Sequence, residues 1–458
     1  MNRRQFLLLA QALGLSAWFG GMAFAQADVI RTRKSATSPA ASGDIETLRR
    51  GVAILVSETA ATQYKSWMYW ANSHGTPNTI PPSMTNVWAQ CHHGTPHFLT
   101  WHRAYVLFFE SLIREITQQD DFALPYWDWF GSSSMPKEFA DKTSSGEENP
   151  LFHKSRAFLK RTLVKAALNE PTFVNFQSTL EGNPHGTVHV MVGGEMGYQE
   201  TSARDPIFWA HHTNIDRMWN VWLTLDGARR NPTDRNWLNQ QFVFDVDGKK
   251  AITVSDMLNN EALGYRYDNV AVTGPSDVIP PRPNNNLLVK GTANMKSLGL
   301  TPQALATKNK VKLTGKSLNV QLLVPSSSSE KMSTMAISPQ GEAVHLSLVL
   351  EGIKATELGL KRGFEYRIYV NLPKQVSSNN QFQNHYIGVI NSFQLGQHAK
   401  HGTSITYQIS SLAEKQSKTA SWSTSDVNLS LVSDDNEEKQ PLIEIENIKL
   451  IMSTEPLK

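Results

Sequence analysis

The sequence predicts a mainly α-helical domain followed by an all-β, sandwich-like domain, and three observations support this. From about residue 45 to residue 271 the chain is rich in tryptophan, phenylalanine and histidine, with apolar side chains at helical spacing. Residues 272–286 (VTGPSDVIPPRPNNN) are rich in proline and asparagine, which is typical of a linker. From residue 287 to residue 458, short runs of β-forming residues alternate with turn residues, as in a β sandwich.

Length and composition limit the number of domains, the possible partners and the possible disulfides. The 458 residues exceed the usual size of one domain, and 40% of them are hydrophobic, which is enough for two cores. The net charge of +3 is small, and the absence of a dense lysine and arginine run excludes a nucleic-acid partner. Cys91 is the single cysteine, so no internal disulfide can form. The sequence does not indicate an oligomeric state.

The first 27 residues are expected to be an export signal rather than part of the fold. They combine a cationic start, an apolar run and the small residues Ala23 and Ala25 at a cleavage site. Residues 2–7 (NRRQFL) resemble a twin-arginine signal, which predicts a periplasmic or secreted protein with no stable membrane insertion after cleavage. An uncleaved membrane anchor is the alternative. Residues 28–44 are small, polar and aperiodic, and are expected to form a flexible leader.

Three helices are expected in the first domain. Residues 101–118 place aromatic and aliphatic side chains at three- and four-residue steps, which predicts a long amphipathic helix. A second helix is expected over 185–191, and a third from about Pro206 to Leu225. We therefore place the helical domain at 45–271 and the β domain at 287–458.

The histidines fall in two clusters. Ten of the fourteen lie between His74 and His212, within and around the segments 91–110 and 181–219. Imidazole binds copper, zinc, iron and nickel, so a region rich in histidine and poor in cysteine predicts a transition-metal site. Two clusters indicate two metal ions.

Spacing alone only partly selects the ligands. His185 and His189 are four residues apart and share one helical face. His211 and His212 are adjacent and point about 100° apart on a helix, so one is expected to be a ligand and the other to pack nearby. Asp216 lies one turn after His212 and is a candidate to orient that ring, with an ion pair to Arg217 as the alternative.

In the first cluster His93 and His102 bracket a turn, while His92 and His97 compete with them. Spacing alone does not decide between these four.

Two long motifs resemble those of the tyrosinase family. The first, HG-x-x-x-FL-x-WHR-x-Y-x-x-x-FE, runs from His93 to Glu110, and the second, DP-x-F-x-x-HH-x-x-x-DR-x-W, runs from Asp205 to Trp219. LPYWDW at 124–129 is a further signature of the family. The resemblance covers about residues 45–270. It implies a catalytic domain built as a four-helix bundle that holds two copper ions, the type 3 copper site.

The resemblance also implies the ligands of each ion. Copper A is expected at His74, His93 and His102, and copper B at His185, His189 and His212. It leaves the remaining histidines of the region, His92, His97, His153 and His211, without a ligand role.

Four further residues receive roles from the resemblance. Cys91 lies two residues before His93, the spacing at which relatives form a thioether to that ring; a buried free cysteine is the alternative. Glu181 matches a buried glutamate that holds a water near the coppers and can take the phenolic proton, which is lost from free phenol only at about pH 10. Gly186 stands where some members carry an asparagine that helps to activate this water. Glycine lacks that amide, so the resemblance implies that Gly186 favours diphenol over monophenol oxidation. Phe208 is expected to form an aromatic wall near copper B.

Tyr265 and Tyr267 resemble the tyrosine motif that closes the catalytic domain of plant-type enzymes. The segments 363–373 and 385–393 resemble the C-terminal domain of those enzymes, which covers the active site until it is removed.

The resemblance implies a copper phenol oxidase that uses O2 as co-substrate to oxidise small o-diphenols to o-quinones, with some monophenol hydroxylation. Tyrosinase and catechol oxidase stay open as alternatives. A hemocyanin-like oxygen carrier is the rival from another class of protein. A di-zinc hydrolase is a further rival, although such sites commonly use carboxylate ligands, which are scarce near these histidines.

Overall fold

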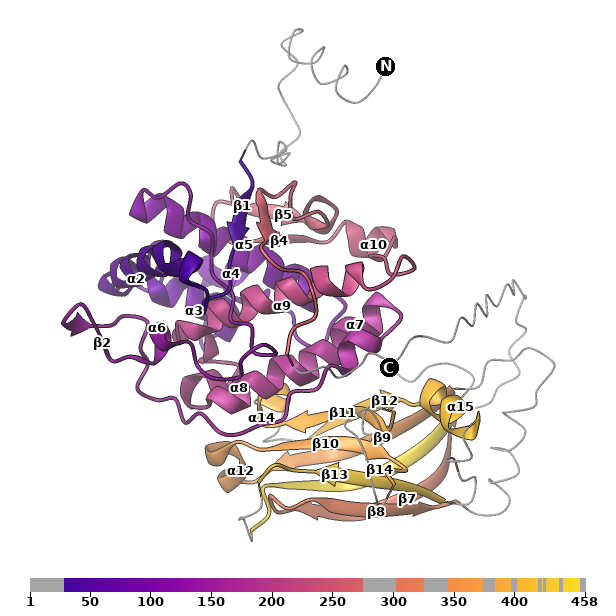
Figure 1. Cartoon of the computed structure of the whole chain (residues 1–458). Coiled ribbons are helices and arrows are strands. Elements are labelled where there is room, and N and C mark those ends of the chain that lie inside the picture. Colours follow the sequence, from indigo (N-terminus) through magenta and orange to yellow (C-terminus); the bar gives the residue numbers. More distant parts are fainter. Residues whose placement is uncertain are drawn as a thin grey trace, which may run out of the picture.

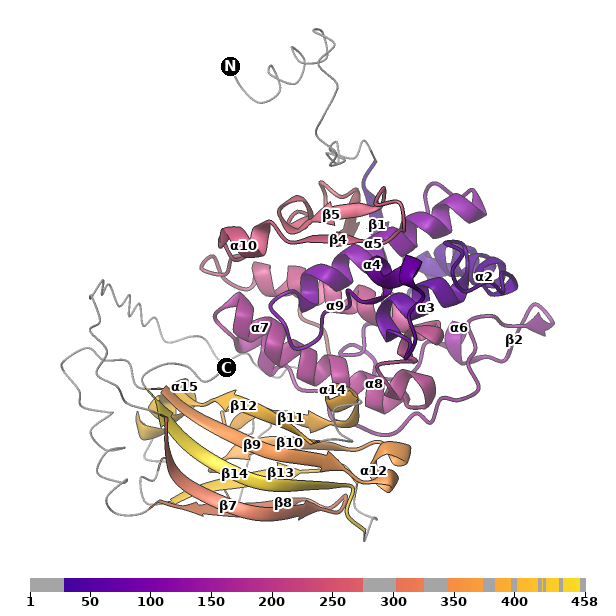
Figure 2. The ribbon, with the colours of Figure 1, turned by 180° about the vertical axis from the view of Figure 1, so that it is seen from behind.

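The chain forms a helical domain stacked on a β domain (Figures 1 and 2). This computed structural model describes residues 29–274, 302–324, 345–373, 384–396, 402–418, 422, 426–435 and 440–453. The expected signal at 1–27, most of the linker at 272–286 and residues 287–301 lie outside these ranges. Among the described helices, none is long and apolar enough to cross a bilayer.

Long helices form the centre of the first domain. Its helices are α2 (Ser42–Ser57), α3 (Trp67–Gly75), α4 (Thr85–Trp88), α5 (Phe98–Thr117), α6 (Lys137–Ala140), α7 (Phe173–Leu180), α8 (Thr187–Val192), α9 (Ile207–Thr224) and α10 (Arg235–Leu238). Its short strands are β1 (Arg31–Arg33), β2 (Thr143–Ser144), β3 (Glu147–Glu148), β4 (Gln241–Val243), β5 (Ala251–Thr253) and β6 (Tyr265–Tyr267). The three predicted helices correspond to α5, α8 and α9. A π-helical turn at Glu181–Gly186 precedes α8.

Helices α5 and α9 pack together through an aromatic core. The rings of Phe109 on α5 and Trp209 on α9 are stacked with centroids 3.5 Å apart, and both side chains are fully buried. Stacked aromatic pairs add to the free energy of burial and fix the relative position of the two helices. This core sets the positions of the histidines that α5 and α9 carry.

The β domain is a sandwich of two four-stranded antiparallel sheets, as predicted. One sheet has the order β11-β10-β13-β8 and the other β12-β9-β14-β7. Their strands are β7 (Gln303–Leu313), β8 (Leu318–Leu323), β9 (His345–Ala355), β10 (Glu365–Val370), β11 (Tyr386–Asn391), β12 (Thr403–Gln408), β13 (Asp426–Val432) and β14 (Ile443–Ser453). Leucine, isoleucine and valine side chains fill the space between the sheets. Helices α12 (Glu357–Arg362), α14 (Ser392–Leu395) and α15 (Ser410–Lys418) lie at the ends of the strands.

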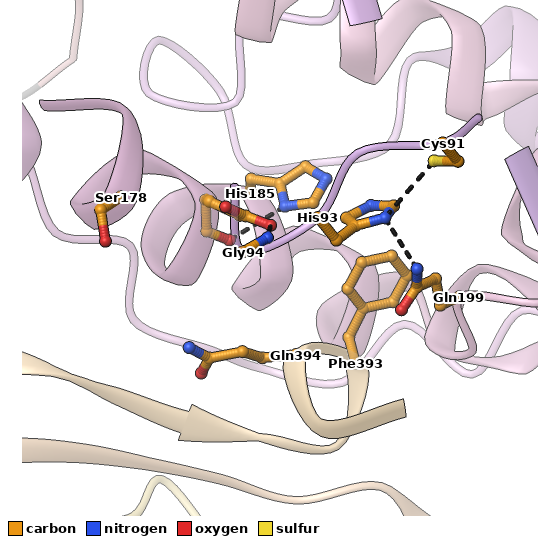
Figure 3. Close-up of a pocket in the computed structure, with 9 residues that line it drawn as sticks. Cys91, His93, Gly94, Ser178, His185, Gln199, Phe393 and Gln394 are labelled. Carbon is orange, nitrogen blue, oxygen red and sulfur yellow. Dashed lines mark hydrogen bonds between the residues drawn. The ribbon is translucent and has the colours of Figure 1, made fainter. Parts of the chain in front are cut away.

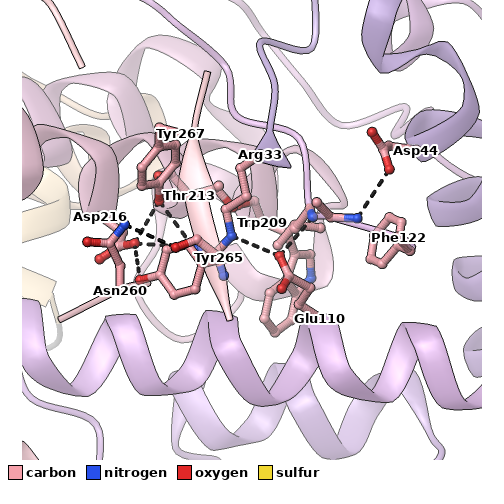
Figure 4. Close-up of polar contacts among 12 residues, drawn as sticks. Arg33, Asp44, Glu110, Phe122, Trp209, Thr213, Asp216, Asn260, Tyr265 and Tyr267 are labelled. Carbon is pink, nitrogen blue, oxygen red and sulfur yellow. Dashed lines mark hydrogen bonds and ion pairs between the residues drawn. The ribbon is translucent and has the colours of Figure 1, made fainter. Parts of the chain in front are cut away.

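The prediction of a flexible leader at residues 28–44 is wrong from Arg31 onward. Strand β1 pairs with β6, with Arg33 opposite Tyr267. The fully buried Arg33 guanidinium donates to Glu110 at 2.8 Å and to Asp216 at 3.1 Å (Figure 4). Two buried carboxylates from different helices need a cation, which composition alone does not reveal.

Asp216 therefore has a structural role that differs from the one expected of it. Besides Arg33, it accepts hydrogen bonds from Arg103 at 2.5 Å and from the hydroxyls of Tyr265 at 2.7 Å and Tyr267 at 2.6 Å. Although burial raises the pKa of this carboxyl, the two arginines hold it below its ordinary value. Asp216 does not orient His212.

The two domains meet at polar contacts and at α14. Arg161 of the helical domain forms a bidentate ion pair with Asp435, with distances of 2.9 and 3.1 Å. The backbone N–H of Thr162 donates to Asp434 at 2.8 Å. On another side, the Tyr198 hydroxyl donates to the carbonyl of Leu360 at 2.7 Å. Helix α14 lies against α8 of the helical domain, the helix that carries His189 (Figure 1).

Candidate metal centre

The first histidine cluster brings together segments from three parts of the chain. His74 comes from the end of α3, His93 from the loop before α5, and His102 from the first turns of α5. Each residue offers one nitrogen, and Cys91 offers its sulfur, with all four atoms within 4.8 Å of one another. His74 and His102 are buried and His93 is partly buried.

The second cluster is built from the π-helical turn, α8 and α9. His185, His189, His211 and His212 each place one nitrogen within 4.8 Å of the others, and all four are buried. Neither cluster contains a carboxylate among the described residues. The donor set is nitrogen with one sulfur, which suits copper or zinc.

The rings are oriented as metal ligands require. The Nδ1 atom of His102 lies 2.8 Å from the carbonyl of Phe98, that of His185 lies 2.9 Å from the carbonyl of Glu181, and that of His189 lies 2.9 Å from the carbonyl of Met196. A carbonyl only accepts, so each Nδ1 carries the hydrogen and each Nε2 keeps a free lone pair.

The free nitrogens point into buried space. Among the described residues, the Nε2 atoms of His74, His93, His102 and His185 are buried without a hydrogen-bond partner. A buried polar atom without a partner is costly, and a metal ion would relieve that cost. Burial lowers the pKa of His74 and His185 to about 3, so these rings are neutral and able to bind metal.

Hydrogen bonding distinguishes His211 from His212. The indole N–H of Trp129 donates to Nδ1 of His211 at 3.1 Å. Since indole is only a donor, that nitrogen must be unprotonated, so a neutral His211 carries its hydrogen on Nε2. His211 then has no free lone pair for a metal. His212 instead places Nε2 3.4 Å from Nε2 of His189, the arrangement of two ligands that converge on one ion.

The two clusters are adjacent. The rings of His102 and His212 are stacked with centroids 4.6 Å apart and an angle of 12°. The ring centroids of His74 and His212 are 5.8 Å apart. Ions held by the two clusters would therefore be neighbours, and the residues present fit a dinuclear copper site.

A cavity of about 350 Å³ opens beside the first cluster. Residues from both domains line it, among them His93, Glu181, His185, Gln199, Phe393 and Gln394 (Figure 3). Glu181 accepts a hydrogen bond from the N–H of Gly94 at 2.6 Å. Burial raises the pKa of the Glu181 carboxyl to about 8, against the opposing effect of that N–H.

Phe208 is present at the site but does not line this cavity. Its fully buried ring lies 4.2 Å from that of His212 and 4.7 Å from that of His74, centroid to centroid. In this arrangement it packs against the histidines from within the domain.

The aromatic ring on the open side of the site is Phe393 of the β domain. The sequence did not single out Phe393. It indicated only that the segment 385–393 resembles the C-terminal domain of plant-type enzymes.

Cys91 and Gly186 lie at the edges of the site. The sulfur of Cys91 is 3.4 Å from Nδ1 of His93 (Figure 3). Gly186 faces the β domain, because a Cβ added there would lie 2.8 Å from the amide nitrogen of Asn391. Of the four residues expected to be non-ligands, His92, His97 and His153 belong to neither cluster, whereas His211 lies in the second.

Segments of both domains match known protein families. Residues 64–163 and 138–225 match the common central domain of tyrosinase, and residues 231–274 match the polyphenol oxidase middle domain. Residues 303–453 match a domain of unknown function, DUF7868. Residues 64–225 and 231–274 of the helical domain are therefore similar to the tyrosinase and polyphenol oxidase family of type 3 copper proteins. Members of that family are copper oxidoreductases with a dinuclear copper site, which the two histidine clusters can hold.

Individual relatives of the chain are also tyrosinases and polyphenol oxidases. The chain is 32% identical over 255 residues to tyrosinase HcTyr1 of Hahella sp. (strain CCB-MM4), covering 45% of this chain and 53% of that protein. It is 28% identical over 333 residues to a chloroplastic polyphenol oxidase of Malus domestica, covering 61% and 54%. The chain thus spans about half the length of these relatives.

Solved structures show the same fold across both domains. Latent apple tyrosinase aligns over 93% of this chain and 97% of its own, with a TM-score of 0.57 and 21% identity. Latent aurone synthase aligns over 97% and 93%, with a TM-score of 0.59 and 19% identity. Deoxygenated hemocyanin from Rapana thomasiana aligns over 92% and 100%, with a TM-score of 0.50 and 15% identity.

Proposed function

We propose that this chain is a copper phenol oxidase that oxidises o-diphenols to o-quinones with O2, and that its β domain covers the active site until it is displaced. The observation that carries the proposal is that two adjacent clusters each bring nitrogens of at least three histidines within 4.8 Å of one another, with several Nε2 atoms buried and unpartnered. When bound, the copper pair would supply the two-electron chemistry with O2. Each diphenol loses two electrons and two protons, and two diphenols reduce one O2 to two waters.

We assign copper A to His74, His93 and His102, and copper B to His185, His189 and His212. The hydrogen bond from Trp129 to His211 supports the choice of His212 over its neighbour. Each assigned ring is neutral because burial lowers its pKa. Substitution of an assigned histidine by alanine is expected to remove one ion, whereas His211→Ala is expected to leave both.

Glu181 is proposed to take the phenolic proton. It is the carboxylic acid among the residues that line the cavity, and it comes from the same turn as His185. A base is needed there because a phenol must lose its proton before it can bind a metal, and it does so in water only at about pH 10. Glu181→Gln is expected to lower the rate on phenols while the copper content stays at two ions.

The β domain is proposed to act as a cover. Phe393 on α14 occupies the space over His185 and His189 that a phenol ring would need. Displacement of α14 would open the cavity to a planar ring, which could then lie against the same histidines. Cleavage in the predicted linker, residues 272–286, is the simplest way to release the cover.

A hemocyanin-like oxygen carrier is the second candidate, and the same observation favours it. An aromatic ring that permanently occupies the substrate position would let O2 enter while excluding phenols. The rates on L-DOPA and tyrosine, measured with copper-loaded protein before and after limited proteolysis, separate the two candidates. Quinone formation supports the oxidase, whereas reversible O2 uptake with no quinone before or after cleavage refutes it. Activity on both substrates indicates a tyrosinase, and activity on L-DOPA alone a catechol oxidase.

Cys91 is proposed to form a thioether with the ring of His93. The sulfur is 3.4 Å from Nδ1 of that ring, so the neighbouring ring carbon is close. Joining sulfur to a ring carbon removes the thiol hydrogen and one ring hydrogen, and O2 would accept the two electrons and two protons. The mass of the intact protein tests this, because the bond lowers it by two hydrogen atoms, and Cys91→Ser is expected to abolish that loss.

Residues 1–27 are proposed to direct export by the twin-arginine route and to be removed. Strand β1 begins at Arg31, so the folded domain starts a few residues after the expected cleavage site. Replacing Arg3 and Arg4 by lysine should leave the precursor in the cytoplasm, and processing that continues unchanged would exclude this route.

A further inference from the structure

His93 differs from the other candidate ligands in how its second ring nitrogen is held. The Nδ1 atoms of His102, His185 and His189 are bonded to backbone carbonyls. Nδ1 of His93 instead lies 2.7 Å from the side-chain amide nitrogen of Gln199 (Figure 3). A backbone carbonyl remains when a side chain is replaced, but this contact depends on the identity of one residue.

Gln199 is placed to hold two rings of the first cluster. Its backbone carbonyl lies 3.2 Å from Nδ1 of His74 and also accepts the hydroxyl of Ser202 at 3.4 Å. Its side chain reaches into the cavity toward His93. One residue therefore contacts the outer nitrogens of His74 and His93, which come from separate segments of the chain.

We propose that Gln199 is a positioning residue for copper A, whose side-chain oxygen accepts the Nδ1–H of His93. This inference rests on the proposed copper site. Nε2 of His93 is the buried nitrogen without a partner, so it is the metal ligand and the ring hydrogen is on Nδ1. The hydrogen needs an acceptor, so the proposal turns the Gln199 amide by 180°, which puts its oxygen in the place that its nitrogen occupies at 2.7 Å. The bond fixes the tautomer and the direction of the lone pair on Nε2.

The surroundings of the amide favour this role. The other group at Nδ1 is the sulfur of Cys91 at 3.4 Å, which is a weak acceptor. On the far side lies Gly396 of the β domain, where an added Cβ would be 3.2 Å from the second atom of the amide, which is the oxygen in this structure and the nitrogen once the amide is turned. A larger residue at position 396 would crowd the amide, so the covering domain leaves room for it.

The test compares three variants of the full chain. Gln199→Leu keeps the shape but removes the acceptor, and Gln199→Glu keeps an acceptor. Gln394→Leu makes the same amide-to-alkyl change at a side chain that lines the same cavity from the β domain. Copper per chain is measured against increasing concentrations of a competing Cu(I) chelator, together with the melting temperature of the metal-free protein.

We expect Gln199→Leu to lower the affinity of one ion about 10- to 100-fold while the second is unaffected, the usual effect of losing a partner of a metal-bound histidine. Chelator concentrations that leave two ions on the wild type should then leave one on this variant. Gln199→Glu and Gln394→Leu should retain both, and the metal-free melting temperatures should agree.

The inference is overturned if Gln199→Leu retains both ions as the wild type does, or if it loses both ions with a lower metal-free melting temperature. Equal loss in Gln394→Leu also overturns it. If the wild type itself does not bind two copper ions, the proposed function fails instead, so the two failures are distinguishable.

Discussion

The ring of Phe393 lies parallel to that of His189, with centroids 3.7 Å apart and an angle of 10° between the planes. Phe393 belongs to the β domain and His189 to the helical domain. This stacked pair joins the β domain directly to a proposed copper ligand, and we propose that Phe393 occupies the position that an aromatic substrate would take. The relationship leads to the first prediction.

Phe393→Ala is expected to raise the diphenol oxidation rate of the uncleaved chain at least about tenfold, because the site opens while the rest of the interface remains. The rate on L-DOPA before and after proteolysis measures this. Gln394→Ala, on the same helix, is the control and should stay close to wild type. A Phe393→Ala chain that still needs cleavage would show that the whole domain, rather than this ring, excludes the substrate.

Gly186→Asn is expected to raise the monophenol rate relative to the diphenol rate, as the resemblance implies. The structure adds a condition, because a side chain at this position meets the amide of Asn391. The substitution should therefore weaken docking of the β domain as well. Measuring the ratio after proteolysis, or in an Asn391→Gly background, separates the two effects. An unchanged or lower ratio in the opened enzyme would refute the proposed role of Gly186.

Docking of the two domains is expected to weaken as the pH rises, because of Glu365 on β10. Its carboxyl is 2% exposed, faces Thr187 of α8, and has Arg367 as its nearest cation at 3.9 Å. Arg161 and Asp434 also act on it. Burial raises the pKa of Glu365 from 4.5 to about 7, against the effect of the arginines.

The sign follows from linkage. The docked pKa lies above that of an exposed glutamate, so docking binds a proton, is strongest at low pH and weakens as the pH rises through about 7. The affinity between the two fragments of the cleaved chain, measured from about pH 5 to about pH 8, should fall on the order of 70-fold. Glu365→Gln should remove this dependence. A variant with the wild-type pH profile would exclude Glu365 as its source.

Arg33→Ala is expected to destabilise the helical domain by about 3–5 kcal/mol, because it leaves Glu110 and Asp216 buried with one fewer cation. Burial raises the pKa of Glu110, but Arg33 and Arg114 together lower it to about 2, so the carboxylate stays charged. Urea unfolding of the metal-free chain gives the free energy. Arg266→Ala, at an exposed position on the paired strand, should cost less than about 0.5 kcal/mol. Similar losses in both variants would argue against the buried pair as the cause.

Local sequence patterns were sufficient for the elements of the fold. The helical periodicity of residues 101–118 predicted α5, because apolar side chains recur there at three- and four-residue steps along a helix that packs against α9. The alternating runs after residue 287 predicted a sandwich, and the segments 303–453 form one. The leader at 28–44 was predicted wrongly, because the burial of Arg33 depends on carboxylates that lie 77 and 183 residues away in the sequence.

The sequence also selected the candidate metal ligands, but it did not give the contacts that orient them. The long motifs selected six histidines as candidate ligands. The structure brings these six together in two clusters, with Cys91 in the first and His211 in the second. No local pattern distinguished His211 from His212 without the resemblance. The hydrogen bond from Trp129, 82 residues away, supplies a physical reason for the choice.

The sequence by itself determined the chemistry available to this protein: imidazoles in two groups, one cysteine, one carboxylate before His185, and a second domain of strands. Residue type and local period carry that information, since both are properties of neighbouring residues. Tertiary structure alone decided which distant groups meet. It set Phe393 on His189, Gln199 on His93 and Asn391 beside Gly186, because these contacts depend on how the two domains and the loops between helices pack in space.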